Sequence, residues 1–245
     1  MSSANLINNL ENILRTFEYN SSKKFKLIAI FGLLGDFDSF EYATNLGKLI
    51  NSKDLDKTLD IYALGIGSSK GKEKFCAFTG LPNKYIQLVP DNKIHNSLGI
   101  SNGLDIGLGG WINMLLMLSG INSKGTIKEV LRGYIGDKKA SQIYANQDTI
   151  DLFNVFKFSG NLFEKTYGKG YLRPFELATF RLNNMIEILR NWDDYILKVD
   201  YLPQRGATFL LNENNKIIYK YYANEILSYS KNMSIPLDFI HKILK

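Results

Sequence analysis

The side chains best placed to do chemistry follow the first long apolar run of the chain. Asp36, Asp38 and Ser39 come directly after the glycine-containing turn of residues 32–35, where a helix is expected to begin near Asp38. Their oxygens can accept hydrogen bonds from the free amides of a first helical turn, so we interpret Asp38 and Ser39 first as helix caps. A redox centre would need a thiol here, because the positive end of the helix dipole stabilises a thiolate. The turn contains no sulfur, so it is a candidate for ligand or anion binding.

The only cysteine of the chain, Cys76, lies in a helix expected over residues 70–79. A single cysteine cannot form an intrachain disulfide, and His95 and His241 do not combine with it at a spacing known for zinc sites, so we expect no metal and no cofactor. Its neighbours are apolar, which indicates a buried, inert thiol, although nearby lysines would lower its pKa if it were exposed. The alternative is a catalytic Cys76 that works as a one-cysteine antioxidant centre, regenerated by an external thiol such as glutathione.

The length, composition and charge of the chain limit the class of protein that it can be. The chain has 245 residues, of which 45% are hydrophobic, enough for a sizeable core. Its net charge is +6, but the lysines and arginines are scattered among acidic residues, so we expect no nucleic-acid binding. No internal repeat or low-complexity linker is visible, which indicates one domain over residues 1–245.

Neither a secretory signal nor a membrane-spanning segment is evident. The N-terminus is polar and lacks a basic stretch followed by an apolar run, so we expect a cytoplasmic protein, or a plastid stromal one if the source is eukaryotic. The most apolar stretch, residues 107–121, is shorter than the roughly 20 residues that cross a bilayer. We interpret it as a buried helix, and the alternative is a segment at a membrane interface.

Apolar runs predict an α/β core in the first half of the chain. The runs at 25–31, 59–67 and 84–89 are typical of strands buried in a parallel sheet, with helices between and after them on both faces. An amphipathic helix over residues 5–19 is expected to cover this sheet.

The C-terminal part of the chain predicts the other half of the sheet. Strands over 207–211 and 216–222 form a hairpin around a polar turn, and a helix follows over 235–244. Combined with the first half, this order predicts a thioredoxin-like fold, an α/β fold with a central mixed sheet flanked by helices.

Between about residues 102 and 201 strand signals almost vanish, so we expect a large helical insertion. Helices are predicted over 109–119, 125–132, 148–157 and 174–192. Seven aromatic residues between Phe153 and Phe175 lie near Arg173, and we interpret them as core. The apolar helix, the aromatic-rich loop and the basic residues of this insertion would suit a surface for an unknown protein or small-molecule partner.

Several stretches of the chain resemble a known family. They are FKLIAIFGLLGDFDSFEYA, KEKFCAFTGLP, LVPDNKIHNSLGI, RPFELATFRLNNMIEILRNW and QRGATFLLNENNKIIYKY, in an order that spans about residues 25–240. The chain is similar in these stretches to the peroxiredoxin-like alkyl hydroperoxide reductase/thiol-specific antioxidant (AhpC/TSA) family. The resemblance implies a thioredoxin fold and a redox or antioxidant background.

The resemblance also assigns a role to Arg205 and reveals a departure. In active members a cysteine thiolate attacks the peroxide and an arginine polarises it. Arg205 corresponds to that arginine, whereas the nucleophile has no counterpart in the turn, so the chain is expected to be a divergent member without the active-site cysteine. Arg205 then either forms a salt bridge with Asp36 or Asp38 or binds an anion or a carbonyl group.

Three functions follow as hypotheses. The first is a peroxiredoxin-like protein that has lost the peroxidatic thiol and binds a partner or small ligand. The second is a thiol-dependent peroxide reductase that uses Cys76. The third is a membrane-peripheral accessory protein that uses residues 107–121.

Overall fold

A five-stranded mixed sheet forms the centre of the computed structural model, which describes residues 2–17, 23–52, 58–152, 155–168 and 170–243. The strands are β1 (Phe25–Leu33), β2 (Leu59–Ile66), β3 (Ile86–Val89), β6 (Gly206–Leu211) and β7 (Ile217–Ala223). They lie in the order β3-β2-β1-β6-β7, with β1, β2 and β3 parallel and the β6–β7 hairpin antiparallel along the other edge of β1.

The central strand β1 joins the two halves of the sheet. Ile28 lies opposite Tyr62 of β2 on one side and opposite Phe209 of β6 on the other. Both faces of β1 are covered, so its sequence is a continuous apolar run instead of an alternating one. The expected strands and the closing hairpin are confirmed, and the chain has a thioredoxin-like fold.

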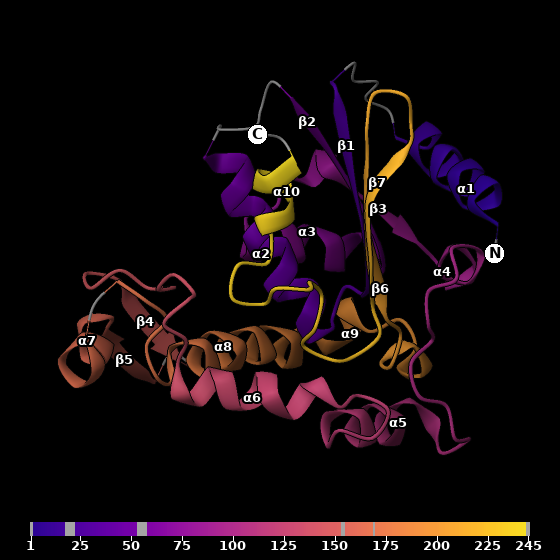
Figure 1. Cartoon of the computed structure of the whole chain (residues 1–245). Coiled ribbons are helices and arrows are strands. Elements are labelled where there is room, and N and C mark those ends of the chain that lie inside the picture. Colours follow the sequence, from indigo (N-terminus) through magenta and orange to yellow (C-terminus); the bar gives the residue numbers. More distant parts are fainter. Residues whose placement is uncertain (1, 18–22, 53–57, 153–154, 169, 244–245) are drawn as a thin grey trace.

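Helices cover both faces of this sheet. They are α1 (Ser3–Arg15), α2 (Phe37–Asn51), α3 (Ser69–Thr79), the short 3₁₀ turn η1 (Asn83–Tyr85), α4 (Lys93–Ser97) and α10 (Asp238–Ile243). Figure 1 shows α1 and α4 on one side of the sheet and α2, α3 and α10 on the other. Leu10 of α1 and Phe40 of α2 are completely buried, and Phe40 packs edge-on against Phe75 of α3 with 5.0 Å between ring centroids. The core therefore lies on both sides of the sheet.

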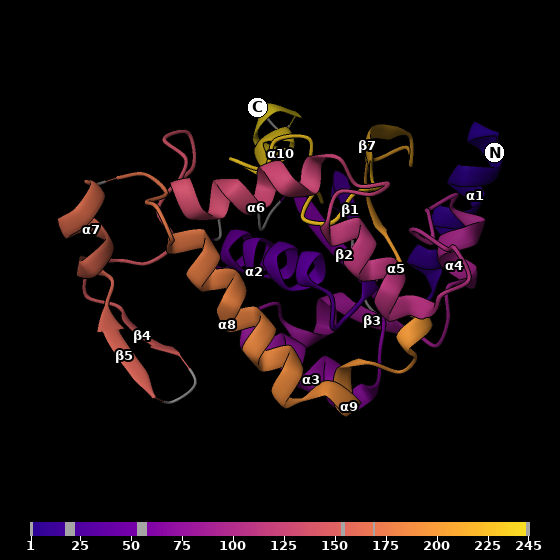
Figure 2. The ribbon, with the colours of Figure 1, turned by 90° about the horizontal axis from the view of Figure 1, so that it is seen from below.

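The insertion forms a separate layer below one end of the sheet. Its elements are α5 (Gly109–Leu118), α6 (Gly125–Ile135), β4 (Thr149–Leu152), β5 (Phe156–Ser159), α7 (Asn161–Tyr167), α8 (Glu176–Arg190), α9 (Trp192–Tyr195) and η2 (Val199–Tyr201). Seen from below, α6 and α8 diverge from one end with α2 visible between them, and α5 lies beyond the other end of α6 at an angle to it (Figure 2). The helices expected over 109–119, 125–132 and 174–192 are present as α5, α6 and α8.

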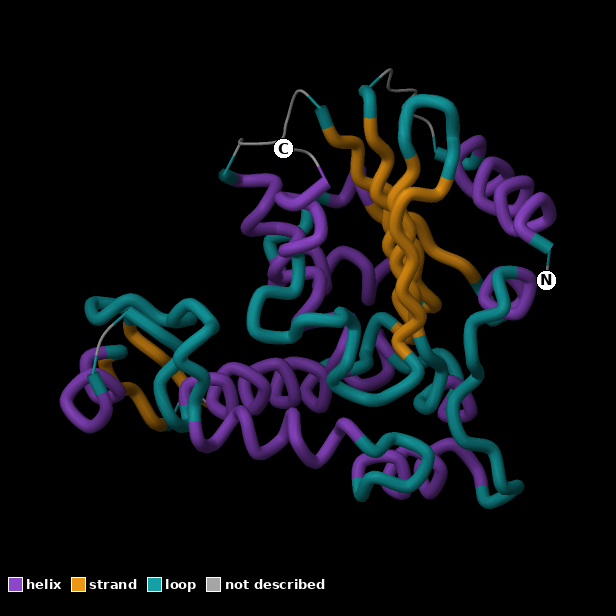
Figure 3. The backbone as a smooth tube through the Cα atoms, viewed as in Figure 1, coloured by secondary structure: helices purple, strands orange, loops and turns teal. Residues whose placement is uncertain are grey.

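The helix predicted over 148–157 is wrong. The described residues of this segment form the antiparallel β4–β5 hairpin, which lies apart from the main sheet at the far end of α6 and α8 (Figure 3). Ile150, which is buried, lies opposite Phe158. A short run of mixed apolar residues fits both helical and strand periodicity, and cross-strand pairing decides between them.

The aromatic residues near Arg173 are only partly core. Phe163 is buried and stacks on Tyr144, whereas Phe156 and Phe175 are exposed. Phe153 lies outside the described residues.

Buried and half-buried ion pairs help to hold the insertion together and to attach it to the sheet layer. Arg173 is completely buried, and its Nη2 donates to Glu176 Oε1 at 2.8 Å and to the Tyr144 carbonyl at 2.7 Å. On α8, Arg181 Nε donates to Oε2 of Glu41 on α2 at 2.7 Å. The first pair closes the insertion on itself, and the second fixes α8 against α2.

Breaking the buried pair inside the insertion is expected to be costly. Arg173→Met leaves the Glu176 carboxylate buried without its cation, and we expect the free energy of unfolding to fall by about 3–5 kcal/mol. In Arg173→Met/Glu176→Gln no unpaired charge remains, so urea unfolding of the double variant is expected to reveal a loss smaller than the sum of the two single losses. Strictly additive losses would contradict this.

Candidate functional site

The turn between β1 and α2 approaches the chain segment before β6 very closely. A Cβ atom at Gly32 would lie 2.4 Å from the Gln204 carbonyl oxygen and 2.7 Å from Asp36 Oδ2. Only glycine fits at this contact, which brings the predicted candidate residues of the turn next to Arg205.

The start of α2 differs by one residue from the sequence prediction. The helix begins at Phe37, and its cap is Asp36, whose Oδ1 accepts a hydrogen bond from the Ser39 amide at 2.5 Å. The interpretation of Asp38 and Ser39 as the caps is therefore corrected. Asp38 lies in the first turn, and its side chain is free to make longer-range contacts.

Asp38 links three segments that are far apart in the sequence. Its Oδ2 accepts from Arg205 Nη1 at 2.9 Å, and its Oδ1 accepts from the Leu227 amide at 2.6 Å. Leu227 has φ 59°, in the left-handed region that a leucine rarely adopts. This strained backbone directs the Leu227 amide at Asp38, and the hydrogen bond helps to hold it there.

Arg205 is occupied by groups of the protein itself. Its Nε donates to the Pro203 carbonyl at 2.7 Å, and only 2% of the residue is exposed. The carbonyl of Ser101 accepts both the Arg205 amide at 3.0 Å and Nε2 of Gln204 at 2.9 Å. Of the two roles expected for Arg205, the structure shows the salt bridge, and its partner is Asp38.

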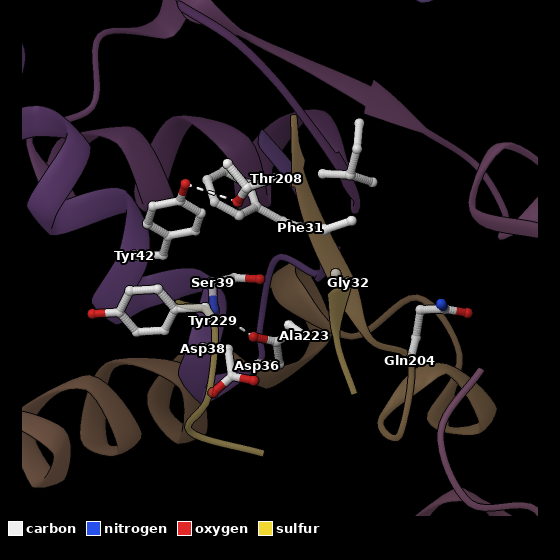
Figure 4. Close-up of a pocket in the computed structure, with 13 residues that line it drawn as sticks. Phe31, Gly32, Asp36, Asp38, Ser39, Tyr42, Gln204, Thr208, Ala223 and Tyr229 are labelled. Atoms are coloured by element: carbon white, nitrogen blue, oxygen red, sulfur yellow. Dashed lines mark hydrogen bonds between the residues drawn. The ribbon is translucent and has the colours of Figure 1, made fainter. Parts of the chain in front are cut away.

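A small cavity of about 20 Å³ lies beside the turn. Figure 4 shows it between the turn, Tyr42, Thr208 and Tyr229, with Tyr42 hydrogen-bonded to Thr208 at 2.8 Å. Within the described ranges, Ser39 Oγ has no hydrogen-bond partner of good geometry. A water molecule needs about 10–15 Å³ of such space, so the cavity has room for little more than one.

Burial dominates the electrostatics of the two carboxyl groups. It raises the pKa of Asp38 to about 7, although Arg205 acts in the opposite direction and Asp36 adds to the rise. Burial also raises the pKa of Asp36, against the lowering effects of Arg205 and the Ser39 amide. The turn therefore carries less negative charge near neutral pH than two free aspartates would.

Cys76 is not part of this arrangement. It lies half-buried on α3 against the main core and does not line the cavity at the turn. Burial raises the pKa of its thiol to about 11, and Lys72 lowers it only in part. At neutral pH the thiol is protonated and a poor nucleophile.

A second, larger and partly open cavity borders the start of α2. Its volume is about 240 Å³, and its walls come from α6, α8, the end of α5 and two residues next to Asp38, namely Phe37 and Leu227. Its lining is almost entirely apolar: Phe37, Leu118, Val130, Gly133, Tyr134, Ala178, Leu182, Met185 and Leu227, with Arg181 at one side.

Sequence reasoning missed this larger cavity. Its walls come from helices whose apolar faces look, in sequence, like faces that pack against each other. Small residues at Gly133 of α6 and Ala178 of α8 lie close together, since a Cβ at Gly133 would come within 3.4 Å of the Ala178 amide nitrogen. Phe37, an apolar side chain between two aspartates, was the one local signal that an apolar wall borders the turn.

Fold and site together define a thioredoxin-type α/β protein with a helical insertion and an acidic turn after β1. The sequence profile of the AhpC/TSA antioxidant enzymes matches residues 46–225, about three quarters of the chain, and the chain belongs to this family. The match begins inside α2, so the turn at residues 32–39 lies before it. Searches of curated proteins and of solved structures gave no significant match.

The raised pKa of Asp38 predicts how stability depends on pH. An unfolded aspartate titrates near 3.9, so between about pH 4 and pH 7 the folded protein binds more protons, and the free energy of unfolding falls as pH rises. Asp38→Asn removes this contribution. The stability difference, wild type minus Asp38→Asn, is expected to shrink between pH 5 and pH 8 in urea titrations.

A matched control is Asp91→Asn. Hydrogen bonds from Lys93 lower the pKa of Asp91, which lies in a surface turn. The contribution of Asp91 to the free energy of unfolding therefore does not fall between pH 5 and pH 8. A wild-type advantage over Asp38→Asn that grows with pH would contradict the prediction.

Proposed function

We propose that this AhpC/TSA family member works by binding a small apolar molecule in the cavity between α6, α8 and the turn, and that it does not reduce peroxides. The observation that carries the proposal is the shared wall between the cavity and the turn. Phe37 and Leu227 line the cavity. Asp38, which follows Phe37 in the chain, accepts a hydrogen bond from the Leu227 amide and so connects the two.

The geometry of the turn argues against ligand binding there. Arg205 and Asp38 satisfy each other, and the adjoining space of about 20 Å³ is too small for more than a water-sized molecule. The turn, which we equate with the family's peroxidatic position, holds a closed ion pair, and this supports a structural role for Asp36, Asp38, Ser39 and Arg205.

The character of the larger cavity supports an uncharged, apolar ligand. At about 240 Å³ it exceeds the roughly 150 Å³ cavity that accommodates benzene in an engineered protein. Among the described residues that line it, the cation is Arg181, which already pairs with Glu41 at 2.7 Å and donates to the Glu129 carbonyl at 2.8 Å. A ligand anion would have to compete with these partners, so apolar contact is the main source of affinity.

The cavity can be tested with a fluorescent apolar probe. N-phenyl-1-naphthylamine is expected to bind the wild type saturably, with increased fluorescence, and Ala178→Phe is expected to weaken binding at least about tenfold because the new ring occupies the cavity. Asn183→Phe, on the same helix but outside the lining, is the control and is expected to retain affinity within about twofold. Equal binding by both variants would refute the cavity as the site, provided that circular dichroism indicates both remain folded.

The alternative of a Cys76 antioxidant makes an opposite prediction. With a protonated, half-buried thiol, hydrogen peroxide consumption in the presence of glutathione is expected to be the same for the wild type and Cys76→Ser. Alkylation of Cys76 by iodoacetamide is expected to be slow at pH 7 and to accelerate about tenfold per pH unit towards pH 10. Turnover that disappears in Cys76→Ser would establish the peroxidase in place of our proposal.

A further inference from the structure

The exposed side chains between residues 105 and 139 have an unusual composition. Ten are large and apolar or aromatic: Ile106, Leu108, Trp111, Ile112, Leu115, Ile121, Ile127, Leu131, Tyr134 and Ile135. The exposed charged residues of the same segment are four lysines, Lys124, Lys128, Lys138 and Lys139, and a single acid, Asp105. Single exposed apolar residues are ordinary, but such a concentration marks an interaction surface.

These residues follow one side of α5 and of α6. On α6 the exposed Ile127, Leu131 and Ile135 are four residues apart, while Thr126, Glu129 and Gly133 are buried against the protein. On α5, Ile112 and Leu115 are exposed and Met114 and Met117 are buried. Figure 2 shows α5 and α6 in front, on the side of the molecule farthest from the free end of the sheet. We call this surface the α5–α6 face.

The α5–α6 face is too short to cross a membrane but well suited to lie on one. No helix within the described ranges is long and apolar enough to span a bilayer, and α5 has only ten residues. A helix pair with apolar side chains towards the outside and lysines along its borders matches the pattern of interfacial segments. Trp111, 42% exposed, is of the residue type that prefers the headgroup region.

We propose that the α5–α6 face docks on the surface of membranes that contain anionic phospholipids. The apolar side chains would enter the region between headgroups and acyl chains, and the four lysines would contact anionic headgroups. Charge decides between a membrane and a second copy of this chain, because a symmetric dimer through this face would bring the lysines of both copies together. An anionic lipid surface supplies the missing counter-charge.

Acidic residues next to the face do not reverse this balance. The 3₁₀ turn η2 packs against α5 and carries the exposed Asp200, and Asp105 precedes the first apolar residue of the face. Both are close to α5, and a third acid, the half-buried Glu225, reaches the first residue of α6, Gly125. The four exposed lysines, which follow α6 and its two ends, outnumber these acids. Salt should therefore weaken the membrane contact mainly by screening the charges of the α6 lysines, and less by screening any group on α5.

The proposal is independent of the ligand cavity, although the two are adjacent. Leu118 and Tyr134 belong to α5 and α6 and also line the cavity of about 240 Å³. A membrane-docked molecule would hold that cavity close to the lipid, which is where apolar ligands are concentrated. Membrane binding can succeed or fail whether or not the cavity binds a ligand.

Flotation with vesicles tests the proposal. The full chain is expected to float with vesicles of 70% phosphatidylcholine and 30% phosphatidylserine, to stay at the bottom with phosphatidylcholine alone, and to lose most of its binding in 0.5 M NaCl. Ile112→Ser/Leu115→Ser/Leu131→Ser and, separately, Lys124→Glu/Lys128→Glu are expected to reduce the bound fraction at least about fivefold. Lys220→Glu/Lys231→Glu changes two exposed lysines elsewhere by the same charge and is expected to have little effect.

Tryptophan fluorescence supplies a second readout. The chain has two tryptophans, whose rings stack with 5.0 Å between centroids, so Trp192→Phe leaves Trp111 as the sole reporter and keeps an aromatic ring for it to stack on. Its emission is expected to shift to the blue with phosphatidylserine vesicles and to be quenched by brominated lipid.

Two results would overturn the proposal. One is an absence of flotation and of any shift in Trp111 emission at low salt. The other is a stable dimer by light scattering that becomes monomeric in the triple serine variant, since this would assign the face to a second copy of the chain.

Discussion

The arrangement of this protein around its turn depends on one buried carboxyl group. Asp38 holds Arg205 with one oxygen and the Leu227 amide with the other, and so joins the start of α2 to the segments before β6 and after β7. A buried charge is costly unless it is paired and hydrogen-bonded, and here both conditions are met by groups from different parts of the chain. The turn that carries Asp36 and Asp38 is thus held by contacts within the protein itself. These contacts also fix the surfaces next to the turn, where we propose that the protein acts.

Those surfaces belong mainly to the insertion. Arg181 and Glu41 fix α8 against α2, and α6 lies beside α8, so the cavity between them has walls from both the insertion and the sheet layer. Helix α6, together with α5, turns its outer side to solvent, where the exposed large apolar residues lie with four lysines and few acids. The insertion packs inward through apolar residues as well as ion pairs, but it also exposes many large apolar side chains on its outer side. That exposed apolar surface is the physical basis for proposing a lipid-facing role.

Periodicity was sufficient for the fold where segments were long and apolar, and it failed where pairing decides. Strand β1 and helix α8 were predictable, because their burial leaves a pattern in consecutive residues. The sequence of the β4–β5 hairpin also fits a helix, because the contact between Ile150 and Phe158 decides its structure and is not visible in either residue alone. At the site, the sequence identified the turn and limited the salt-bridge partner of Arg205 to Asp36 or Asp38. It could not identify the Leu227 amide, because a backbone donor and its left-handed conformation leave no residue-type signal.

The two ends of the insertion meet at a single carbonyl group. The oxygen of Ser101, just before the insertion, accepts hydrogen bonds from Gln204 and Arg205, just after it. About a hundred residues therefore leave and rejoin the sheet at one point. The entropy cost of closing such a loop rises only logarithmically with its length, so residues could be added or removed within it during evolution at little cost to the sheet. The insertion can therefore change in length and sequence during evolution without altering the register between β1 and β6.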